Sequence, residues 1–306
     1  MPIDAAAKSL IDALNAQGFK SFEQMSVEEV RGAVASFTGL QATPQEVARV
    51  VNTVYPGPGG NQDLRIYIPQ APAPLPVVVY FHGGGFVAGG LSVVDEPCRA
   101  LADDAGVIVV AATYRLAPEH KFPAATDDAF AALKWVAKNI QQYGGDGSRI
   151  VVMGDSAGGN LAAVTALRAR DENGPDIRAQ ILIYPVIDST AKLPSRAEFK
   201  DGYLITAAGL DWFWAHYLAS PEDAQNPLAS PSKAASLAGL PPALVLSTEY
   251  EVARDEGEAY GKQLAAAGVD TQAIRFDGLI HGVYWMSGAV PRSKELHDAI
   301  VKFLGR

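Results

Sequence analysis

A serine in a glycine-rich turn is the strongest chemical signal in the sequence. The residues GDSAGG at 154–159 follow the apolar run IVVM and precede a helical segment that starts at Asn160. A G-x-S-x-G element between a strand and a helix is typical of a nucleophile elbow, a sharp turn that exposes the serine hydroxyl. The helix start also directs free N–H groups toward a developing negative charge. We therefore interpret Ser156 as a nucleophile. A nucleotide-binding loop would need a glycine spacing and a lysine that are missing here.

A serine hydroxyl needs a base, and the chain has five histidines as candidates. Where such an elbow occurs, the partners follow in the order serine, acid, histidine, so the two histidines before Ser156 are excluded. His297 falls in a C-terminal helical pattern and His216 in an aromatic stretch. His281 lies in the loop DGLIHG after the last predicted strand, so it is the predicted base.

The acid should lie between the serine and the histidine, just after the predicted strand ALVLST at 243–248. Three carboxylates are close together there, Glu249, Glu251 and Asp255, and position alone leaves the choice open. Asp255 also suits the first turn of a helix, where acidic side chains interact favourably with the helix dipole. Glu251 lies in the loop and is preferred, with Asp255 as the alternative acid.

The residues HGGGF at 82–86 follow another predicted strand, VVVYF. Glycines let the backbone approach a ligand closely, and a loop of this kind supplies oxyanion N–H donors together with the amide after the nucleophile. The predicted donors are the amides of Gly83, Gly84 and Ala157. We expect His82, Gly85 and Asp155 to support the two motifs without reacting.

The elements that position these residues follow an alternating pattern. Short β-branched runs alternate with helical segments at 77–81, 107–113, 150–154, 180–185, 243–248 and 271–276. Apolar strands separated by helices indicate an α/β fold with a mostly parallel sheet flanked by helices. The run at 64–69 is expected to add an antiparallel edge.

Two segments lie outside this alternation. Residues 1–48 carry helical periodicity, and residues 188–227 are rich in aromatic side chains. Because ligands of open α/β sheets bind beyond the carboxyl ends of the strands, we expect both segments to form a helical cap over a core of residues 49–187 and 228–306. The aromatics are equally compatible with ordinary helix core. The residues expected to line the pocket are Phe86, Tyr184, Tyr203, Leu204, Trp212, Phe213, Ile280 and Val283.

Composition excludes several classes of function. With 25 Lys+Arg against 34 Asp+Glu the net charge is −9, which argues against nucleic acid as a partner. No apolar run approaches the ~18 residues of a membrane helix, and the first residues do not resemble a signal peptide. A single cysteine cannot form an internal disulfide. The expected location is the cytoplasm, with no membrane association, metal or cofactor.

Taken together, the motifs resemble the hormone-sensitive lipase family, that is, the bacterial family IV esterases of the α/β-hydrolase fold, in its GDSAG branch. The resemblance rests on HGGGF (82–86), YRLAPEHKFPAA (114–125), GDSAGGN (154–160), ARDEGEAY (253–260) and GLIHG (278–282), all in family order. It implies a sheet of about eight strands, a helical cap, a cofactor-free serine hydrolase with a preference for short acyl chains, and the option of a homodimer.

One residue departs from the family pattern. The family usually has Asp-Pro-Leu-Arg-Asp-Glu-Gly at the acid, whereas this chain reads EVARDEG at 251–257, which places Glu251 in the acid position. The predicted function is a serine carboxylesterase that hydrolyses small, neutral, short-chain esters through an acyl-enzyme. The alternatives are an amide, carbamate or lactone hydrolase with the same triad, a lipase or peptidase for larger substrates, and a non-catalytic ligand-binding receptor. Such receptors lack the histidine that this chain has.

Overall fold

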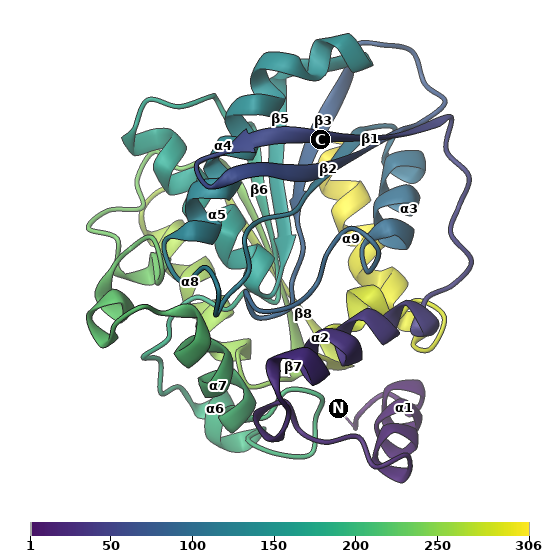
Figure 1. Ribbon diagram of the computed structural model, residues 1–306, viewed down its shortest axis with the longest axis vertical. Helices are drawn as coiled ribbons and strands as arrows, with labels where there is room; N and C mark the ends of the chain where they lie inside the picture. The colour runs from purple at the N-terminus through teal and green to yellow at the C-terminus, as the bar shows by residue number, and fades with distance from the viewer. Residues whose placement is uncertain (1, 306) are drawn as a thin grey trace.

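A twisted eight-stranded sheet runs through the centre of the molecule (Figure 1). The computed structural model describes residues 2–305, so the outermost residues of the expected segments, 1 and 306, lie outside it. The strand order is β1-β2-β4-β3-β5-β6-β7-β8. The strands are β1 (Arg49–Gly57), β2 (Gly60–Ile68), β3 (Leu75–Phe81), β4 (Ile108–Ala112), β5 (Gly145–Asp155), β6 (Ala179–Ile183), β7 (Ala243–Tyr250) and β8 (Thr271–Ile280).

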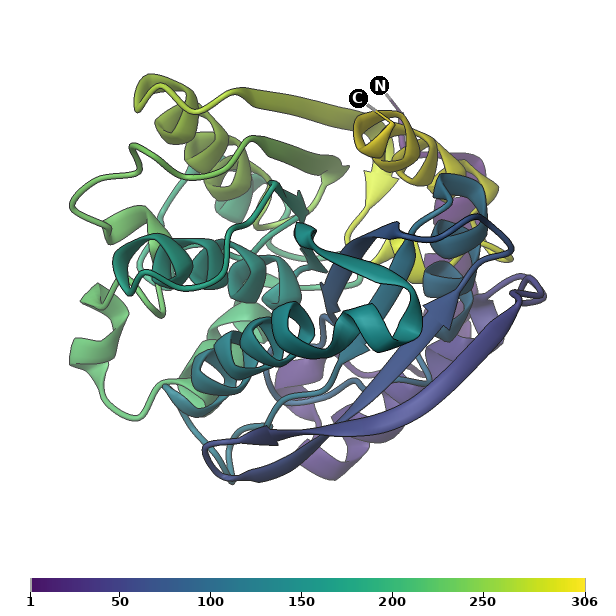
Figure 2. The same ribbon diagram turned by 90° about the horizontal axis from the view of Figure 1, so that it is seen from above.

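The sheet confirms the predicted α/β class. Strand β2 pairs antiparallel with β1 and β4, and the remaining pairs are parallel. The run at 64–69 is antiparallel, as expected, but it does not form the edge of the sheet, because β1 pairs on its outer side. Strand β1 was not anticipated, because it is an edge strand whose side chains are mostly exposed or half-buried. Figure 2 shows the long β1–β2 hairpin crossing one side of the molecule.

Helices cover both faces of the sheet. Figure 1 shows α3 and α9 on one side and α4, α5 and α8 on the other. The helices are α1 (Ala5–Ala16), α2 (Val27–Ser36), α3 (Asp95–Ala105), α4 (Ala124–Asn139), α5 (Ala157–Asp171), α6 (Pro194–Glu198), α7 (Ala207–Tyr217), α8 (Arg254–Ala266) and α9 (Lys294–Leu304). No helix within residues 2–305 has both the length and the apolar character needed to cross a membrane.

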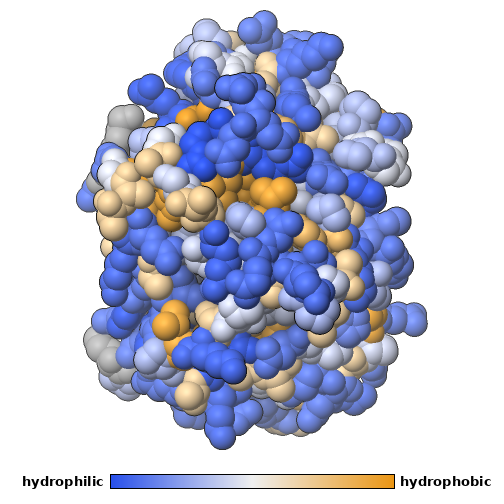
Figure 3. All heavy atoms as spheres, turned by 90° about the vertical axis from the view of Figure 1, so that its left-hand side faces the viewer, coloured by the Kyte–Doolittle hydropathy of each residue, from blue (hydrophilic) through white to orange (hydrophobic). Residues whose placement is uncertain are grey.

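Burial explains why the central strands read as continuous apolar runs. All residues of β4, and residues 77–81 of β3, are buried, because these strands have helices on both faces. The outer surface on the side of α4 and α8 is mainly hydrophilic (Figure 3). Among the described residues only Val54 and Leu193 are large hydrophobic residues that are exposed.

Helices α1, α2, α6 and α7, with the chain segments beside them (residues 2–40 and 194–217), form a separate layer, here called the end layer, at one end of the molecule (Figure 1). Its two chain segments are far apart in the sequence but contact each other. The rings of Phe22 and Phe213 lie 5.5 Å apart, and the hydroxyl of Thr206 donates to the Glu23 carboxylate over 2.9 Å. The end layer lies beyond the carboxyl ends of the parallel strands, where this fold class binds its ligands.

The loop between β4 and α4 is held by a buried ion pair. Both Nε and Nη2 of Arg115 donate to the carboxylate of Asp128, over 2.7 and 3.0 Å, and the Arg115 backbone amide donates to it as well. Asp128 is fully buried. The same loop carries Ala117, whose amide donates to the carbonyl of Phe86 over 2.9 Å. The ion pair thereby supports the glycine-rich loop at 82–86.

This pair generates a stability prediction. Replacing Asp128 with Asn leaves the Arg115 charge without its counter-ion in a largely buried site, which typically costs about 3–5 kcal/mol of unfolding free energy. Urea unfolding of Asp128→Asn should show this loss. The control is Asp12→Asn, which removes an exposed pair with Lys8 and should change stability little. Equal stabilities of the two variants would contradict the prediction.

Candidate active site

Ser156 occupies the tight turn between β5 and α5. Its backbone has φ 54° and ψ −118°, an unusual conformation for a residue with a side chain. Its amide donates to the carbonyl of Ile183 at the end of β6, over 2.9 Å, which ties the turn to the neighbouring strand. The side chain is thereby presented at the carboxyl end of the sheet, as an elbow requires.

His281 lies directly after β8 and reaches Ser156. Its Nε2 is 2.9 Å from the Ser156 hydroxyl, and its Nδ1 is 2.5 Å from a carboxylate oxygen of Glu251. This network fits an imidazole that carries its proton on Nδ1 and leaves Nε2 to accept the proton of the hydroxyl. The structure therefore brings together the serine, histidine and glutamate named from the sequence.

Glu251 follows β7, and its side chain is inaccessible to solvent. One carboxylate oxygen faces His281, and the other accepts the backbone amide of Thr248 over 3.3 Å. The amide contact fixes the longer glutamate side chain against the end of its own strand. The geometry accommodates the extra methylene relative to the aspartate that is usual at this position.

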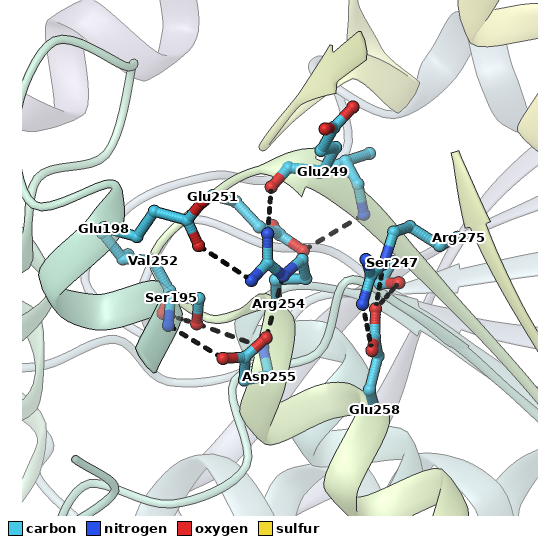
Figure 4. Close-up of polar contacts among 11 residues, drawn as sticks. Ser195, Glu198, Ser247, Glu249, Glu251, Val252, Arg254, Asp255, Glu258 and Arg275 are labelled. Atoms are coloured by element: carbon cyan, nitrogen blue, oxygen red, sulfur yellow. Dashed lines mark hydrogen bonds and ion pairs between the residues drawn. The ribbon is translucent and has the colours of Figure 1, made fainter. Parts of the chain in front are cut away.

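Asp255, the alternative acid, is turned elsewhere (Figure 4). One of its carboxylate oxygens accepts the amide of Ser195 over 2.8 Å, and the other accepts Nε of Arg254 over 2.8 Å. Ser195 also donates its hydroxyl to the carbonyl of Val252 over 3.0 Å. Asp255 therefore fastens helix α6 to the start of α8 and makes no contact with His281.

The first turn of α8 makes two further polar contacts with the segment between β6 and the end of α6. Arg254 donates to the Glu198 carboxylate over 3.1 Å, and Glu256 accepts the amide of Ile187 over 3.2 Å. Arg254 also donates to the carbonyl of Glu249 over 3.2 Å (Figure 4). The turn that follows Glu251 thus holds the segment from residue 187 to 198 by several polar contacts.

The prediction that Gly83 is an oxyanion donor is wrong. Its amide already donates to the carboxylate of Asp155 over 3.0 Å, so it is not free to bind a substrate. Gly84 and Gly85 have φ of +107° and +62°, line the space in front of Ser156, and donate to no acceptor within residues 2–305. The amide of Ala157, at the first position of α5, likewise has no helical acceptor.

Two buried groups brace the loop at 82–86. Asp155 accepts the Tyr80 hydroxyl over 2.6 Å in addition to the Gly83 amide, and complete burial raises its pKa to about 6. The ring of His82 stacks on Tyr114 with centroids 4.4 Å apart. Burial lowers the pKa of His82 to about 4, so the ring is neutral at pH 7 and contributes shape without charge.

An apolar cavity opens in front of Ser156, here called the serine cavity. Three of the residues expected in the pocket line it, Phe86, Leu204 and Phe213. The others in its wall were not anticipated: Phe22, Val34, Phe37, Val186, Ile205, Leu210, Trp214, Val252, Ala253, Gly282 and Trp285.

Five residues expected in the pocket do not line the serine cavity. Ile280 and Val283 are fully buried on either side of His281. The Tyr184 ring packs behind His281, with centroids 4.7 Å apart. The other two, Tyr203 and Trp212, pack against Tyr250 and His216 respectively. The sequence places all five near the site, but the direction of each side chain depends on tertiary packing.

The N-terminal contribution to the serine cavity had only a weak signal in the sequence. Phe22, Val34 and Phe37 come from the first 40 residues, where apolar spacing predicted amphipathic helices without showing which partner they cover. Within the described part of the chain, no group of three or more His, Cys, Asp or Glu side chains is arranged to hold a metal ion.

Comparison with known proteins agrees with this geometry. Residues 78–285 match the family described as alpha/beta hydrolase fold. Esterase LipI from Mycobacterium tuberculosis is 42% identical over 291 residues, covering 94% of this chain and 90% of the relative. The ethyl acetate hydrolase of Pseudomonas putida is 38% identical over 242 residues, covering 78% and 76%. A solved structure of a hyperthermophilic esterase from Pyrobaculum calidifontis has a TM-score of 0.94 at 41% identity, covering 99% of this chain and 98% of that one.

Glu256 generates a prediction of pH dependence. Complete burial raises its pKa from 4.5 to about 8, so between these values the folded protein keeps a proton that the unfolded chain releases. The unfolding free energy should therefore fall as pH rises through this window, by up to about 1.4 kcal/mol per pH unit. Glu256→Gln keeps an acceptor for Ile187 but cannot titrate.

The test is urea unfolding of wild type and Glu256→Gln from pH 5 to pH 8. The stability of the variant relative to wild type should increase steadily with pH. An exposed Glu46→Gln variant controls for the loss of one negative charge. A constant difference between wild type and Glu256→Gln would show that the buried carboxyl does not titrate in this window.

Proposed function

The chain belongs to the hormone-sensitive lipase family of α/β-hydrolase-fold esterases and is a carboxylic ester hydrolase, and from this premise we propose that it cleaves small, neutral, short-chain esters through an acyl-enzyme on Ser156. The observation that carries the proposal is the chain of hydrogen bonds from Ser156 through His281 to Glu251 at the floor of an apolar cavity.

In the first step, the Ser156 hydroxyl attacks the ester carbonyl carbon and His281 Nε2 accepts its proton. The 2.9 Å separation of these atoms supports direct transfer. Glu251 then stabilises the imidazolium, since its carboxylate lies 2.5 Å from Nδ1. Because both partners are buried, this charge interaction is stronger than it would be in water.

We assign the oxyanion site to the amides of Gly84, Gly85 and Ala157. Gly84 and Gly85 line the same cavity as Ser156, Ala157 follows Ser156 in the chain, and none of the three amides has an acceptor among the described residues. Donors that are free in the resting state and fixed by backbone geometry stabilise the tetrahedral intermediate without reorganisation. Gly85 takes the place that the sequence had given to Gly83.

The reaction is completed by proton return. His281 protonates the oxygen of the leaving alcohol, and the ester bond breaks to leave an acyl group on Ser156. Water then attacks the acyl carbonyl and gives its proton to His281, and the proton passes to Ser156 as the acid departs. Each turnover consumes one water and restores all three side chains.

We propose that the end layer acts as a cap that selects the substrate. Its aromatic and aliphatic side chains, including Phe22, Phe37 and Phe213, wall the serine cavity. Burying a charged group in such a wall is unfavourable without a partner, which supports neutral esters. The bulky rings leave little room beside Ser156, which supports short acyl groups.

Hydrolysis of p-nitrophenyl esters from acetate to laurate tests the function. Wild type should turn over the short esters and lose activity as the acyl chain lengthens. Ser156→Ala should lose activity by roughly 10⁶-fold and show no burst of p-nitrophenol. A folded wild-type protein that is inactive on every ester would contradict the proposal.

A second experiment separates the two carboxylates. Glu251→Gln removes the charge that stabilises the imidazolium, and kcat should fall by up to about 10⁴-fold. Asp255→Asn should keep kcat within a few-fold while lowering the melting temperature, because it weakens the attachment of α6. Full activity of Glu251→Gln together with loss in Asp255→Asn would transfer the acid role to Asp255.

A further inference from the structure

A second hollow adjoins the serine cavity, here called the α1 hollow. It lies between helix α1 and residues 202–206 of the end layer. Ile11, Leu14 and Asn15 of α1 line one side of it, and Tyr203, Leu204 and Thr206 line another. Leu204 also lines the serine cavity, so its side chain forms a wall common to both spaces.

Leu204 stands on the histidine side of the serine cavity. Its Cδ2 lies 3.5 Å from the position that a Cβ on Gly282 would occupy, and Gly282 is the residue after His281. Two of the three amides assigned to the oxyanion, those of Gly84 and Gly85, border the cavity from a different part of the chain. The partition between the two spaces is therefore adjacent to the histidine.

The chain around Leu204 is anchored on both sides while Leu204 itself is only half-buried. Before it, the Tyr203 ring packs on Phe199 and Tyr250, with centroids 5.5 and 5.1 Å away. After it, Thr206 caps helix α7 through the amide of Gly209 and bonds to Glu23. Rotation of a half-buried leucine side chain is fast on the timescale of turnover, so the partition can open without movement of its supports.

We propose that the α1 hollow is a second substrate compartment that receives the far end of the alcohol group of longer alkyl esters, and that Leu204 sets the length of alcohol the enzyme accepts. The proposal rests on the proposed function, because it assigns a direction to the bound ester. His281 must reach the leaving oxygen to protonate it, so the alcohol extends along the histidine side, toward Gly282 and Leu204. The apolar Ile11 and Leu14 suit an alkyl chain.

The test compares alkyl acetates from ethyl to octyl in wild type and Leu204→Ala. Shortening the partition opens a path into the α1 hollow, so the ratio of kcat/KM for octyl over ethyl acetate should rise by about tenfold or more, as expected for a few added methylene contacts. Leu193→Ala is the matched control, since Leu193 belongs to the same segment but lines neither space. Its ratio should equal that of wild type.

A blocking variant checks that the gain arises in the α1 hollow. Asn15 is exposed and lines the hollow from helix α1, so Asn15→Trp fills it at a distance from Ser156. Combined with Leu204→Ala, this substitution should return the octyl-to-ethyl ratio of kcat/KM to that of wild type. Cooperative thermal unfolding followed by circular dichroism shows that each variant is folded.

The outcomes separate the two proposals. If folded Leu204→Ala still hydrolyses ethyl acetate but its octyl-to-ethyl ratio equals that of wild type, the compartment is overturned and the esterase function stands. If the gain appears with p-nitrophenyl octanoate and not with octyl acetate, the assignment to the alcohol is overturned. A folded wild-type protein that hydrolyses no ester overturns the proposed function, and this inference with it.

Discussion

The close approach of two backbones behind Ser156 is the constraint on which the site depends. A Cβ on Gly158 would lie 1.9 Å from the carbonyl oxygen of Phe81, and a Cβ on Gly154 would lie 2.1 Å from the carbonyl oxygen of Gly158. Since such distances exclude any side chain, only glycine allows α5 to begin this close to the end of β3. The serine and the loop at 82–86 are consequently held in fixed relation by backbone contact.

The strand order then determines how the other two side chains reach the serine. Strand β6 lies between β5 and β7, and β8 is farther still, so His281 must cross the ends of two strands to reach Ser156. Tyr184, at the end of β6, occupies the intervening space and packs against the His281 ring. Its hydroxyl accepts the amide of Tyr284 over 3.2 Å, which ties it to the loop that carries the histidine.

Local patterns in the sequence were enough to predict the α/β class, the elbow and the order of the site residues, because each depends on neighbours along the chain. The competition for the Gly83 amide was not predictable, since Asp155 reaches it from a different loop. The same limit applies to Tyr203 and Trp212, which the sequence placed in the pocket. Their rings turn to partners that only the folded chain supplies.

The turn after Glu251 connects substrate selection with the acid. Residues 254–256 contact the end layer at Glu198 and Ser195, and the chain leading into it at Ile187. These contacts lie only a few residues beyond the carboxylate that bonds to His281. Because several contacts share this attachment, the loss of one weakens the docking of α6 without removing the bonds that hold Glu251. Substrate selection and the acid therefore share one turn of the chain, while the alignment of His281 rests on Glu251 itself.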